Sequence, residues 1–427
     1  MDVKYIKNIV VINQPLGNRG DESAHRSLLR AMDKSFPESK ITVLFLNGNE
    51  EAVQDFIVKS PRIKYQNITG FTKAIGWAMA WSIRLNMLFV TPLLYPVMRK
   101  YAAYIKNSDL VVCAPGGICM GGFQSWTHIF NLCLTKHYKK RLVYYSRSFG
   151  PFPEKTKWNR IFKKTSHQLL NSFDYLSIRD KKTMLLADKL NLSYVPSIDT
   201  AFLDTPEVEI PAGILDVIDS EKFIVFVPNS LTWHTAYKKR EQEDIDSFFL
   251  EIFKLIESKD LKVLMLPQLT QHVTYSETDY DYFLKLKNIA GNKNVVVLKD
   301  TYSSDIQQKI ISKAELVIGA RYHSVVFAIN NNTPFISLSY EHKMTGLLNI
   351  LNLNDREINI EDLGTKEFDK ENALQNLKKM LNSNASELES AKKRARKIAV
   401  ETFEKFDEFC NCSTRVGYQM TKIFNHD

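Results

Sequence analysis

Short apolar runs rich in β-branched residues recur along the first half of the chain, with segments of helical periodicity between several of them. The second half repeats the alternation, and its helix-length segments include residues 241–258 and 302–312. Strands that alternate with helices predict parallel sheets covered by helices on both faces. The predicted strands are residues 9–12, 41–45, 110–113, 142–145, 175–178, 223–227, 263–266, 295–298, 316–318 and 335–338.

A length of 427 residues fits two domains of about 200 residues each better than a single core. Pro206, Pro211 and several acidic residues interrupt the core pattern between residues 204 and 220. We therefore predict an α/β protein with two doubly wound Rossmann-like domains facing a cleft. Residues 1–205 form the first domain and residues 206–380 the second. Residues 381–427 form a C-terminal helical segment, with the helix at about residues 385–424.

Residues 73–106 do not follow this alternation. The segment is rich in Trp, Tyr, Met and Leu and carries Lys and Arg at both ends. Arg84, Asn86, Pro92 and Pro96 argue against a membrane-spanning helix, which needs about 20 mostly apolar residues. Two interpretations remain open. In the first, the segment lies on a membrane or binds a lipid-linked acceptor, with Trp77 and Trp81 at the level of the headgroups. In the second, it is a long helical excursion that covers the sheet.

The formal charge of +9 and the pI near 9.0 indicate an anionic partner: nucleic acid, a membrane surface, or a substrate with phosphate or carboxylate groups. Nucleic acid is disfavoured, because the basic residues are dispersed and no recognised binding signature occurs. The five cysteines lack the spacing of a metal site or a disulfide framework. The N-terminus lacks the features of a signal peptide, so we expect a cytoplasmic protein.

The loop after residues 316–318 carries the clearest candidate chemistry. The chain breaks at Gly319 and continues through Arg321, His323 and Ser324 into an apolar helix. A helix N-terminus offers free backbone N–H groups and a positive dipole end, and Arg adds a planar fork for carboxylate or phosphate. His323 can bring a proton to the same place. The alternative is that Arg321 pairs with a carboxylate and His323 serves as a cap.

Loops after other predicted strands add further candidates, because ligands bind beyond the carboxyl ends of strands in open α/β sheets. The first such loop contains Asn18 and Asp21 between glycines, and the third contains Gly116 and Gly117. Glycines let the backbone approach a ligand, while Asn and Asp supply short polar groups at a helix start.

Two more cationic side chains occupy corresponding positions. Arg179 follows a strand of the first domain as Arg321 does in the second, and Lys343 follows the last predicted strand. Arginines that face one cleft would suit a small ligand with two anionic groups. For each arginine alone, a surface salt bridge with Asp180 or Glu315 remains the competing interpretation.

Seven short motifs follow one another between about residues 10 and 352. They are Gly17-Asn-Arg-Gly-Asp-Glu22, Pro115-Gly-Gly117, Phe149-Gly-Pro-Phe152, Ile178-Arg-Asp180, Asp199-Thr-Ala-Phe202, Arg321-Tyr-His323 and Tyr340-Glu-His-Lys343. In this order they resemble the polysaccharide pyruvyl transferase family. The chain departs from the family pattern where the loop after Pro115 lacks a third consecutive glycine, and where Asp-Thr-Ala at Asp199 replaces Asp-Pro-Ala.

The resemblance implies a GT-B-like fold and transfer of the pyruvyl group of phosphoenolpyruvate onto a pair of sugar hydroxyls. The products are a cyclic pyruvate ketal and phosphate, in the synthesis of capsule or exopolysaccharide. Phosphoenolpyruvate is a co-substrate, and the scheme needs no cofactor and no metal. The acceptor is a sugar or a lipid-linked saccharide. If residues 73–106 contact lipid, the protein acts at the inner face of the cytoplasmic membrane.

Within that scheme the first domain holds the acceptor and the second holds the donor. His323 protonates the enol methylene, and Asp21 orients or deprotonates the sugar hydroxyl. The donor would be bound by Arg179, Arg321, Lys343 and Ser324, and the acceptor by Asn18, Gly116 and Gly117.

Two other functions fit the same residues. A GT-B glycosyltransferase that uses a nucleotide sugar would need a similar basic cluster for its diphosphate. A non-catalytic scaffold docked on a membrane through residues 73–106 is the third possibility, although intact Arg179, Arg321, His323 and Lys343 argue against a degenerate site.

Overall fold

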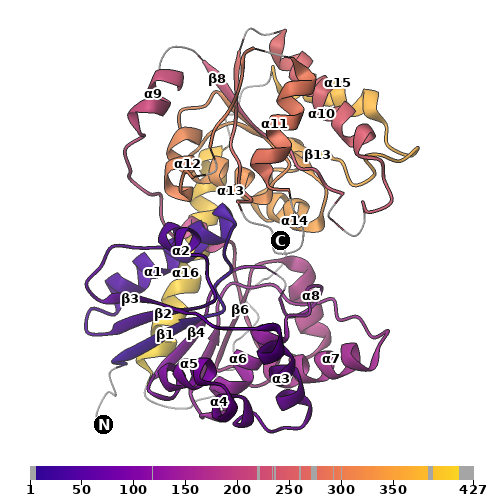
Figure 1. Ribbon diagram of the computed structural model, residues 1–427. Coiled ribbons are helices and arrows are strands. Elements are labelled where there is room, and N and C mark those ends of the chain that lie inside the picture. Colours follow the sequence, from indigo (N-terminus) through magenta and orange to yellow (C-terminus); the bar gives the residue numbers. More distant parts are fainter. Residues whose placement is uncertain are drawn as a thin grey trace. The chain divides into compact units, whose positions relative to one another are not determined.

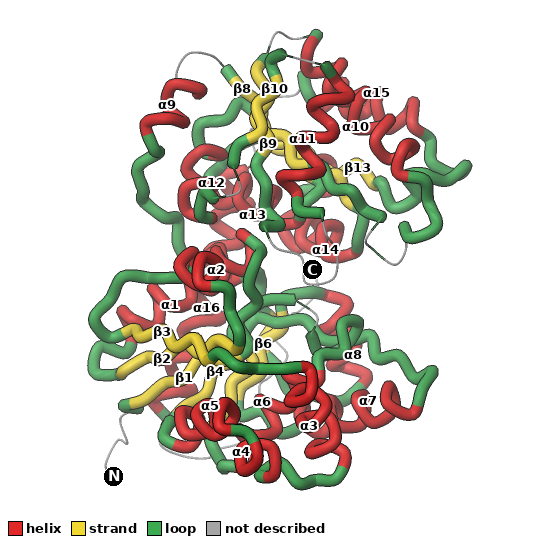
Figure 2. The backbone as a smooth tube through the Cα atoms, viewed as in Figure 1, coloured by secondary structure: helices red, strands yellow, loops and turns green. Residues whose placement is uncertain are grey.

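A computed structural model describes residues 6–117, 119–218, 222–232, 234, 237–258, 261–270, 277–291, 293–299, 301–382 and 388–412. The chain forms two compact units, and each is described on its own below (Figures 1 and 2). Unit 1 comprises residues 1–16, 24–203 and 398–427, and unit 2 comprises residues 17–23 and 204–397. The boundary at 203/204 lies two residues from the predicted one.

Unit 1 is built on a seven-stranded parallel sheet of order β3-β2-β1-β4-β5-β6-β7. Its strands are β1 (Asn8–Ile12), β2 (Lys40–Leu46), β3 (Ile63–Ile68), β4 (Leu110–Cys113), β5 (Arg141–Tyr144), β6 (Tyr175–Ile178) and β7 (Val195–Pro196). Its helices are α1 (Arg19–Ser35), α2 (Glu50–Asp55), α3 (Lys73–Arg84), α4 (Val90–Leu94), α5 (Pro96–Lys106), α6 (Trp126–His137), α7 (Lys157–Leu170), α8 (Lys181–Lys189) and the 3₁₀ turn η1 (Thr200–Leu203). The first turn of α1 belongs to unit 2.

Unit 2 contains a six-stranded parallel sheet of order β10-β9-β8-β11-β12-β13. Its strands are β8 (Phe223–Val227), β9 (Lys262–Met265), β10 (Val295–Val297), β11 (Leu316–Gly319), β12 (Phe335–Ser339) and β13 (Glu357–Asn359). Its helices are α9 (Ala212–Ile218), α10 (Gln242–Glu257), α11 (Asp279–Ala290), α12 (Ser304–Ile311), α13 (Tyr322–Asn330), α14 (His342–Leu351), η2 (Asn354–Arg356) and α15 (Lys370–Met380).

All ten predicted strands are present, which confirms the prediction of two parallel α/β units. Strands such as β8 are buried at every position, as expected for sheets covered on both faces. The sequence pattern missed β3, β7 and β13. The middle of β3 is partly exposed, with buried residues only at its ends, and β7 and β13 have two and three residues, so none presents a continuous apolar run.

The predicted C-terminal helix is α16 (Leu388–Asn411); the predicted ends at residues 385–387 and 413–424 lie outside the described residues. Residues 388–397 are grouped with unit 2 and residues 398–411 with unit 1, so the helix is not a separate module. In unit 1 the Phe406 ring packs against Tyr145 and Tyr175, at 5.4 and 5.7 Å between ring centroids. The Tyr175 hydroxyl donates to the Thr402 carbonyl at 2.9 Å. These contacts hold the helix on unit 1.

The strand order of each sheet defines where a ligand crevice can form. In unit 1 the order reverses between β1 and β4, and in unit 2 between β8 and β11. Loops that leave two such strands diverge, which opens a crevice beyond their carboxyl ends. Arg321 leaves β11 at this point of unit 2, and Gly116 leaves β4 at this point of unit 1. No helix among the described residues meets the length and hydropathy that a membrane span requires.

Candidate active site

The turn that follows β11 is built around a close contact between Gly319 and Ser324. A Cβ atom on Gly319 would lie 2.1 Å from the Ser324 Oγ. This hydroxyl donates to the Arg321 carbonyl at 2.5 Å, and the Ala320 N–H donates to the Val227 carbonyl of β8 at 2.8 Å. Ser324 is fully buried. The structure therefore uses Ser324 to shape the turn, whereas the sequence had suggested a contact with the donor.

Arg321 occupies the N-cap position of α13 and forms an ion pair with Asp279. Asp279 is the first residue of α11, and its other carboxylate oxygen accepts from the N–H groups of Gln268 and Leu269, at 3.0 and 2.9 Å. The pair is nearly buried, and it differs from the surface partner expected for Arg321. That expected partner, Glu315, instead lies 3.4 Å from Lys222 on the surface. Arg321 is thereby held in one orientation at the strand ends.

Residues 17–23 are attached to unit 2, although the sequence placed them in the first domain. The Arg19 N–H donates to the Gln268 carbonyl at 2.8 Å, and the Thr270 N–H donates to the Gly17 carbonyl at 2.9 Å. Asn18 forms an antiparallel bridge with Leu269. Asn18 and Asp21 were predicted on the acceptor side. The structure instead brings them to the unit that carries Arg321 and His323.

The imidazole of His323 lies against Gly20, in the first turn of α1. A Cβ atom on Gly20 would lie 1.8 Å from the His323 Nδ1, which is far inside van der Waals contact. On its other sides the ring packs near Tyr322 and Phe327, at 4.9 and 6.1 Å between centroids. The N-terminal turns of α1 and α13 therefore meet at His323. Both helices point the positive ends of their dipoles at this place, which favours an anion here.

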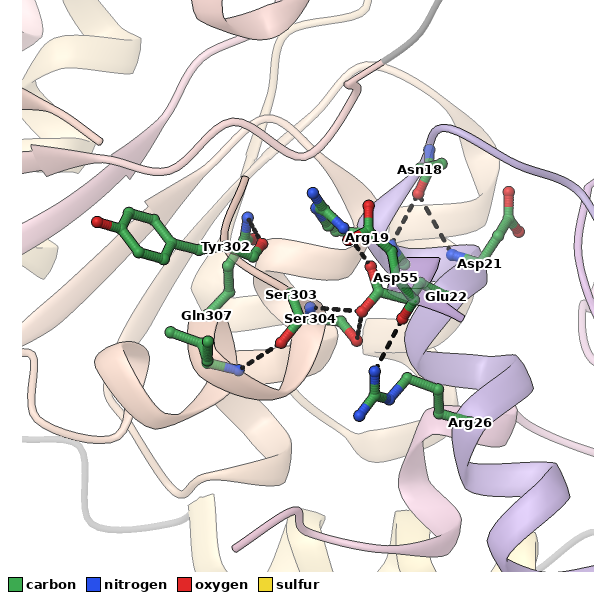
Figure 3. A network of polar contacts seen from close by, with 12 residues as sticks. Asn18, Arg19, Asp21, Glu22, Arg26, Asp55, Tyr302, Ser303, Ser304 and Gln307 are labelled. Atoms are coloured by element: carbon green, nitrogen blue, oxygen red, sulfur yellow. Dashed lines mark hydrogen bonds and ion pairs between the residues drawn. The ribbon is translucent and has the colours of Figure 1, made fainter. Parts of the chain in front are cut away.

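The Asn18 side chain organises the start of α1. Its Oδ1 accepts from the Gly20 N–H at 2.8 Å and from the Asp21 N–H at 3.3 Å (Figure 3). This is an N-cap arrangement, in which a short polar side chain satisfies the first amides of the helix. Asn18 thus fixes the turn that carries Gly20 against His323. Asp21, which follows Gly20, is partly exposed.

A buried network joins the first turn of α1 to α12 (Figure 3). The Glu22 carboxylate receives Arg19 Nη1 at 2.6 Å, and its second oxygen accepts from the N–H and the hydroxyl of Ser304, at 2.8 and 2.9 Å. A carboxylate at the N-terminus of α12 is favoured by the helix dipole. The sequence analysis assigned no role to Arg19 or Glu22, although both stand inside the first motif.

Lys343 lies in the first turn of α14, after β12. Its Nζ is 3.8 Å from the Glu341 carboxylate, and its side chain is 17% exposed, so it is partly shielded from water. The buried Tyr340 ring packs edge-on to His234, at 5.9 Å between centroids. Burial raises the pKa of the Tyr340 phenol and lowers the pKa of His234. His234 stands in the loop after β8 and had no sequence signal.

In unit 1, Arg179 forms a buried ion pair with Asp199. Asp199 also accepts from the Ala201 N–H at 3.0 Å. The expected alternative partner, Asp180, instead caps α8 through the Thr183 N–H at 2.8 Å and accepts from the Ser148 hydroxyl at 2.5 Å. Two of the seven motifs therefore contain the two halves of one ion pair.

The glycine-rich loop after β4 is held by Arg147, which the sequence analysis did not single out. Its fully buried guanidinium donates to the carbonyls of Ala114, Asn13 and Gly117; the last two contacts are 3.3 Å each. Gly116 has φ +150° and forms a parallel bridge with Arg147. A Cβ atom on Gly117 would meet open space. Asn13 follows β1, whereas Ala114 and Gly117 follow β4. Arg147 therefore joins the two loops that leave the sheet where its strand order reverses.

The candidate residues are thus divided between the units. Unit 2 brings together Asn18, Asp21, Arg321, His323, Ser324 and Lys343, and unit 1 contains Gly116, Gly117 and Arg179. Within the described part of the chain no cluster of three or more His, Cys, Asp or Glu side chains is suited to hold a metal ion.

Comparison with known proteins shows the family to which the chain belongs and the fold that it shares with solved structures. The profile of the family described as polysaccharide pyruvyl transferase matches residues 18–342. The amylovoran biosynthesis protein AmsJ of Erwinia amylovora is 21% identical over 375 residues, which is 84% of this chain and 89% of that protein. Its name connects a similar chain with the biosynthesis of a polysaccharide.

Two solved structures with the same fold were determined with nucleotide sugars. UDP-GlcNAc 2-epimerase of Methanocaldococcus jannaschii, solved with UDP-GlcNAc and UDP, aligns with a TM-score of 0.54 at 13% identity, over 93% of this chain and 99% of that one. UGT71G1 of Medicago truncatula, solved with UDP-glucose, aligns with a TM-score of 0.57 at 8% identity, over 95% and 98%. At these identities the likeness shows a GT-B-like fold.

Proposed function

Because the chain belongs to the polysaccharide pyruvyl transferase family, we propose that it transfers the pyruvyl group of phosphoenolpyruvate onto two hydroxyls of a sugar during polysaccharide biosynthesis. The acceptor class is a saccharide of a surface polysaccharide, carried on a lipid. The observation that carries the proposal is the contact between Gly20 and His323 beside Arg321. This contact joins the first family motif to the Arg-X-His motif in one place.

The reaction needs a proton at one atom and a leaving group at the next. A sugar oxygen forms a bond to C2 of phosphoenolpyruvate while C3 gains a proton and becomes a methyl group. A second sugar oxygen then bonds to C2 as the C2–O bond to phosphate breaks, and the two hydroxyl protons balance the one taken up at C3 and the one that leaves with phosphate. Positive charge develops at C2 as C3 is protonated and again as phosphate leaves, so the site must hold the donor and its anionic groups firmly in place.

The residues of unit 2 match these requirements. Arg321 supplies a planar fork for the carboxylate or phosphate, and the positive end of the α13 dipole favours the same anion. Lys343 supplies a second cation, and His323 is the proton donor to C3. Asp21 follows Gly20 in the same turn and orients the attacking hydroxyl. Arg179, the remaining residue predicted to bind the donor, lies in unit 1, where it pairs with Asp199.

The test is phosphate release from phosphoenolpyruvate with a panel of sugar and lipid-linked acceptors, with mass spectrometry of the acceptor. We expect phosphate release and a mass increase corresponding to one pyruvate ketal on the same acceptor. Thermal stabilisation by nucleotide sugars, with none by phosphoenolpyruvate, would instead favour a glycosyltransferase of the same fold. Binding of neither class of ligand would favour a non-catalytic scaffold.

Gly20→Ala tests the contact that supports the proposal. The new methyl group must displace the His323 ring, and a misplacement of about 1 Å at a reacting group can lower turnover about 10²-fold. We therefore expect a loss of about 10² in kcat for phosphate release. Gly213→Ala in α9 is the matched control, because a Cβ atom there meets nothing within 4 Å. Equal activity of the two variants would contradict the placement of His323.

A further inference from the structure

A large exposed apolar surface covers the outward face of α3 and α4 in unit 1. In Figure 1 these helices lie with α5 beside α6 and α7, and the contacts between the elements agree. The residues of this surface, here called the apolar face, are 41–66% exposed although all are large and hydrophobic. They are Trp77, Trp81, Leu85, Met87, Phe89, Leu93, Leu94 and Phe123. Only Leu185 and Ile289 join them as exposed large hydrophobics in the described chain.

The helices beneath the apolar face are firmly packed, so the exposure is a property of the folded unit. The inward side of α3 contributes Ile75 and Met79 to the core of unit 1, and the inward side of α5 contributes Met98 and Tyr101. The hydroxyls of Ser82 and Thr91 are 2.6 Å apart in the buried joint between α3 and α4. The segment therefore covers the sheet with one face and presents apolar side chains to solvent with the other.

Aromatic side chains join the α3 part of the apolar face to α6 and α7. Trp158 of α7 packs edge-on to Trp81 and Trp126, at 5.4 and 5.3 Å between centroids, and lies 6.4 Å from Trp77. Arg84 is stacked over Trp81 at 4.6 Å. Phe123 lies three residues before Trp126, at the end of the glycine-rich loop after β4. The face therefore runs from α3 towards the loop that carries Gly116 and Gly117.

All charged residues on α3, α4 and α5 are cations, whereas beside Trp158 of α7 the exposed Glu154 pairs with Lys163. No Asp or Glu occurs between Asp55 and Asp109. The same stretch of α3 to α5 carries exposed cations at its margins, namely Lys73, Arg84, Arg99, Lys100 and Lys106. A stretch that carries several exposed cations and no acidic residue matches the headgroups of anionic phospholipids. Tryptophan is also the side chain that is enriched at the boundary between headgroups and acyl chains.

We infer that the apolar face is a monotopic docking surface for a bilayer that contains anionic phospholipid. Trp77, Leu93 and Leu94 enter the boundary between headgroups and acyl chains, while the cations at the margin pair with the headgroups. This inference stands on the surface of unit 1 alone and does not depend on the reaction proposed above. Together with that reaction, it would bring the glycine-rich loop close to acceptors embedded in the same bilayer.

Flotation with vesicles tests the inference without reference to turnover. We expect the full chain to float with vesicles of phosphatidylglycerol and phosphatidylcholine, to float less with phosphatidylcholine alone, and to be released by salt. The triple variant Trp77→Ser/Leu93→Ser/Leu94→Ser should lower the partition coefficient by about tenfold or more, because it removes three apolar side chains from the bilayer. Leu185→Ser/Ile289→Ser is the matched control, since both side chains are 53% exposed away from the face.

Each alternative outcome has a defined meaning. Equal flotation of the triple variant and the control, or no flotation of the unmodified chain, would overturn the inference. Light scattering tests whether the apolar face is instead a contact between two copies of the chain. A dimeric unmodified chain and a monomeric triple variant, neither of which floats, would show such a contact and would also overturn the inference. Thermal melting of both variants shows that they are folded. Retained phosphate release with a soluble acceptor separates membrane docking from the reaction.

Discussion

His323→Gln is expected to lower kcat for phosphate release from phosphoenolpyruvate by about 10²–10⁴, the usual contribution of a positioned general acid. Glutamine keeps much of the size of the imidazole against Gly20, but it cannot deliver a proton to C3. The KM for phosphoenolpyruvate should change little, because Arg321 and Lys343 remain in place. Steady-state kinetics with both substrates varied separate the two parameters.

The control for this variant is His137→Gln, which changes an exposed histidine at the end of α6 in unit 1. It should leave kcat unchanged. Full turnover of His323→Gln would remove His323 from the mechanism, while a rise in KM without a fall in kcat would assign it to donor binding. Gly20→Ala displaces the same imidazole ring that His323→Gln removes. A fall in kcat in both variants would therefore show that turnover depends on the position of this ring.

Asp279→Ala is expected to destabilise unit 2 by about 3–5 kcal/mol, because it leaves the nearly buried guanidinium of Arg321 without its counter-charge. The variant also removes the acceptor of the Gln268 and Leu269 N–H groups. Denaturant unfolding, followed by a probe specific to unit 2, measures the change. The combined variant Arg321→Met/Asp279→Leu should lose less, since no buried charge remains unpaired.

Glu315→Gln gives the matched surface control. Glu315 pairs with Lys222 at 3.4 Å, and their side chains are 49% and 73% exposed. Exposed pairs of this kind contribute at most about 1 kcal/mol. The comparison is direct, because the sequence offered Glu315 as a partner of Arg321. A similar loss of stability in Glu315→Gln and Asp279→Ala would contradict the role of the buried pair.

Sequence motifs identified the loops that carry the candidate residues of unit 2 better than they predicted how those loops are built. Arg321, His323 and Lys343 all follow strand ends, as expected from their spacing after apolar runs. Ser324 follows the same turn, but its hydroxyl is used inside the turn. Spacing along the chain identifies the loop on which a side chain stands. It does not determine whether the side chain points outward or back into its own turn, because that depends on the turn's hydrogen bonds.

Ion-pair partners could not be predicted from neighbouring residues. Arg179 pairs with Asp199, 20 residues away, and Arg321 pairs with Asp279, 42 residues away. In both cases an acidic residue closer in sequence was the natural expectation. Buried charges require a counter-charge at short range in space. Parallel sheets bring together the ends of strands and the starts of helices that are far apart in sequence.

The sequence alone determined the alternation of strands and helices, the order of the family motifs and the apolar, acid-free composition of residues 73–106. These are properties of local periodicity and residue type, which neighbouring residues specify by themselves. Only the tertiary structure decided that residues 17–23 belong to unit 2, that Gly20 receives the His323 ring, and that residues 73–106 have one buried and one exposed apolar face. The physical reason is that close packing and the pairing of buried charges depend on which distant segments meet, and no single stretch of the chain carries that information.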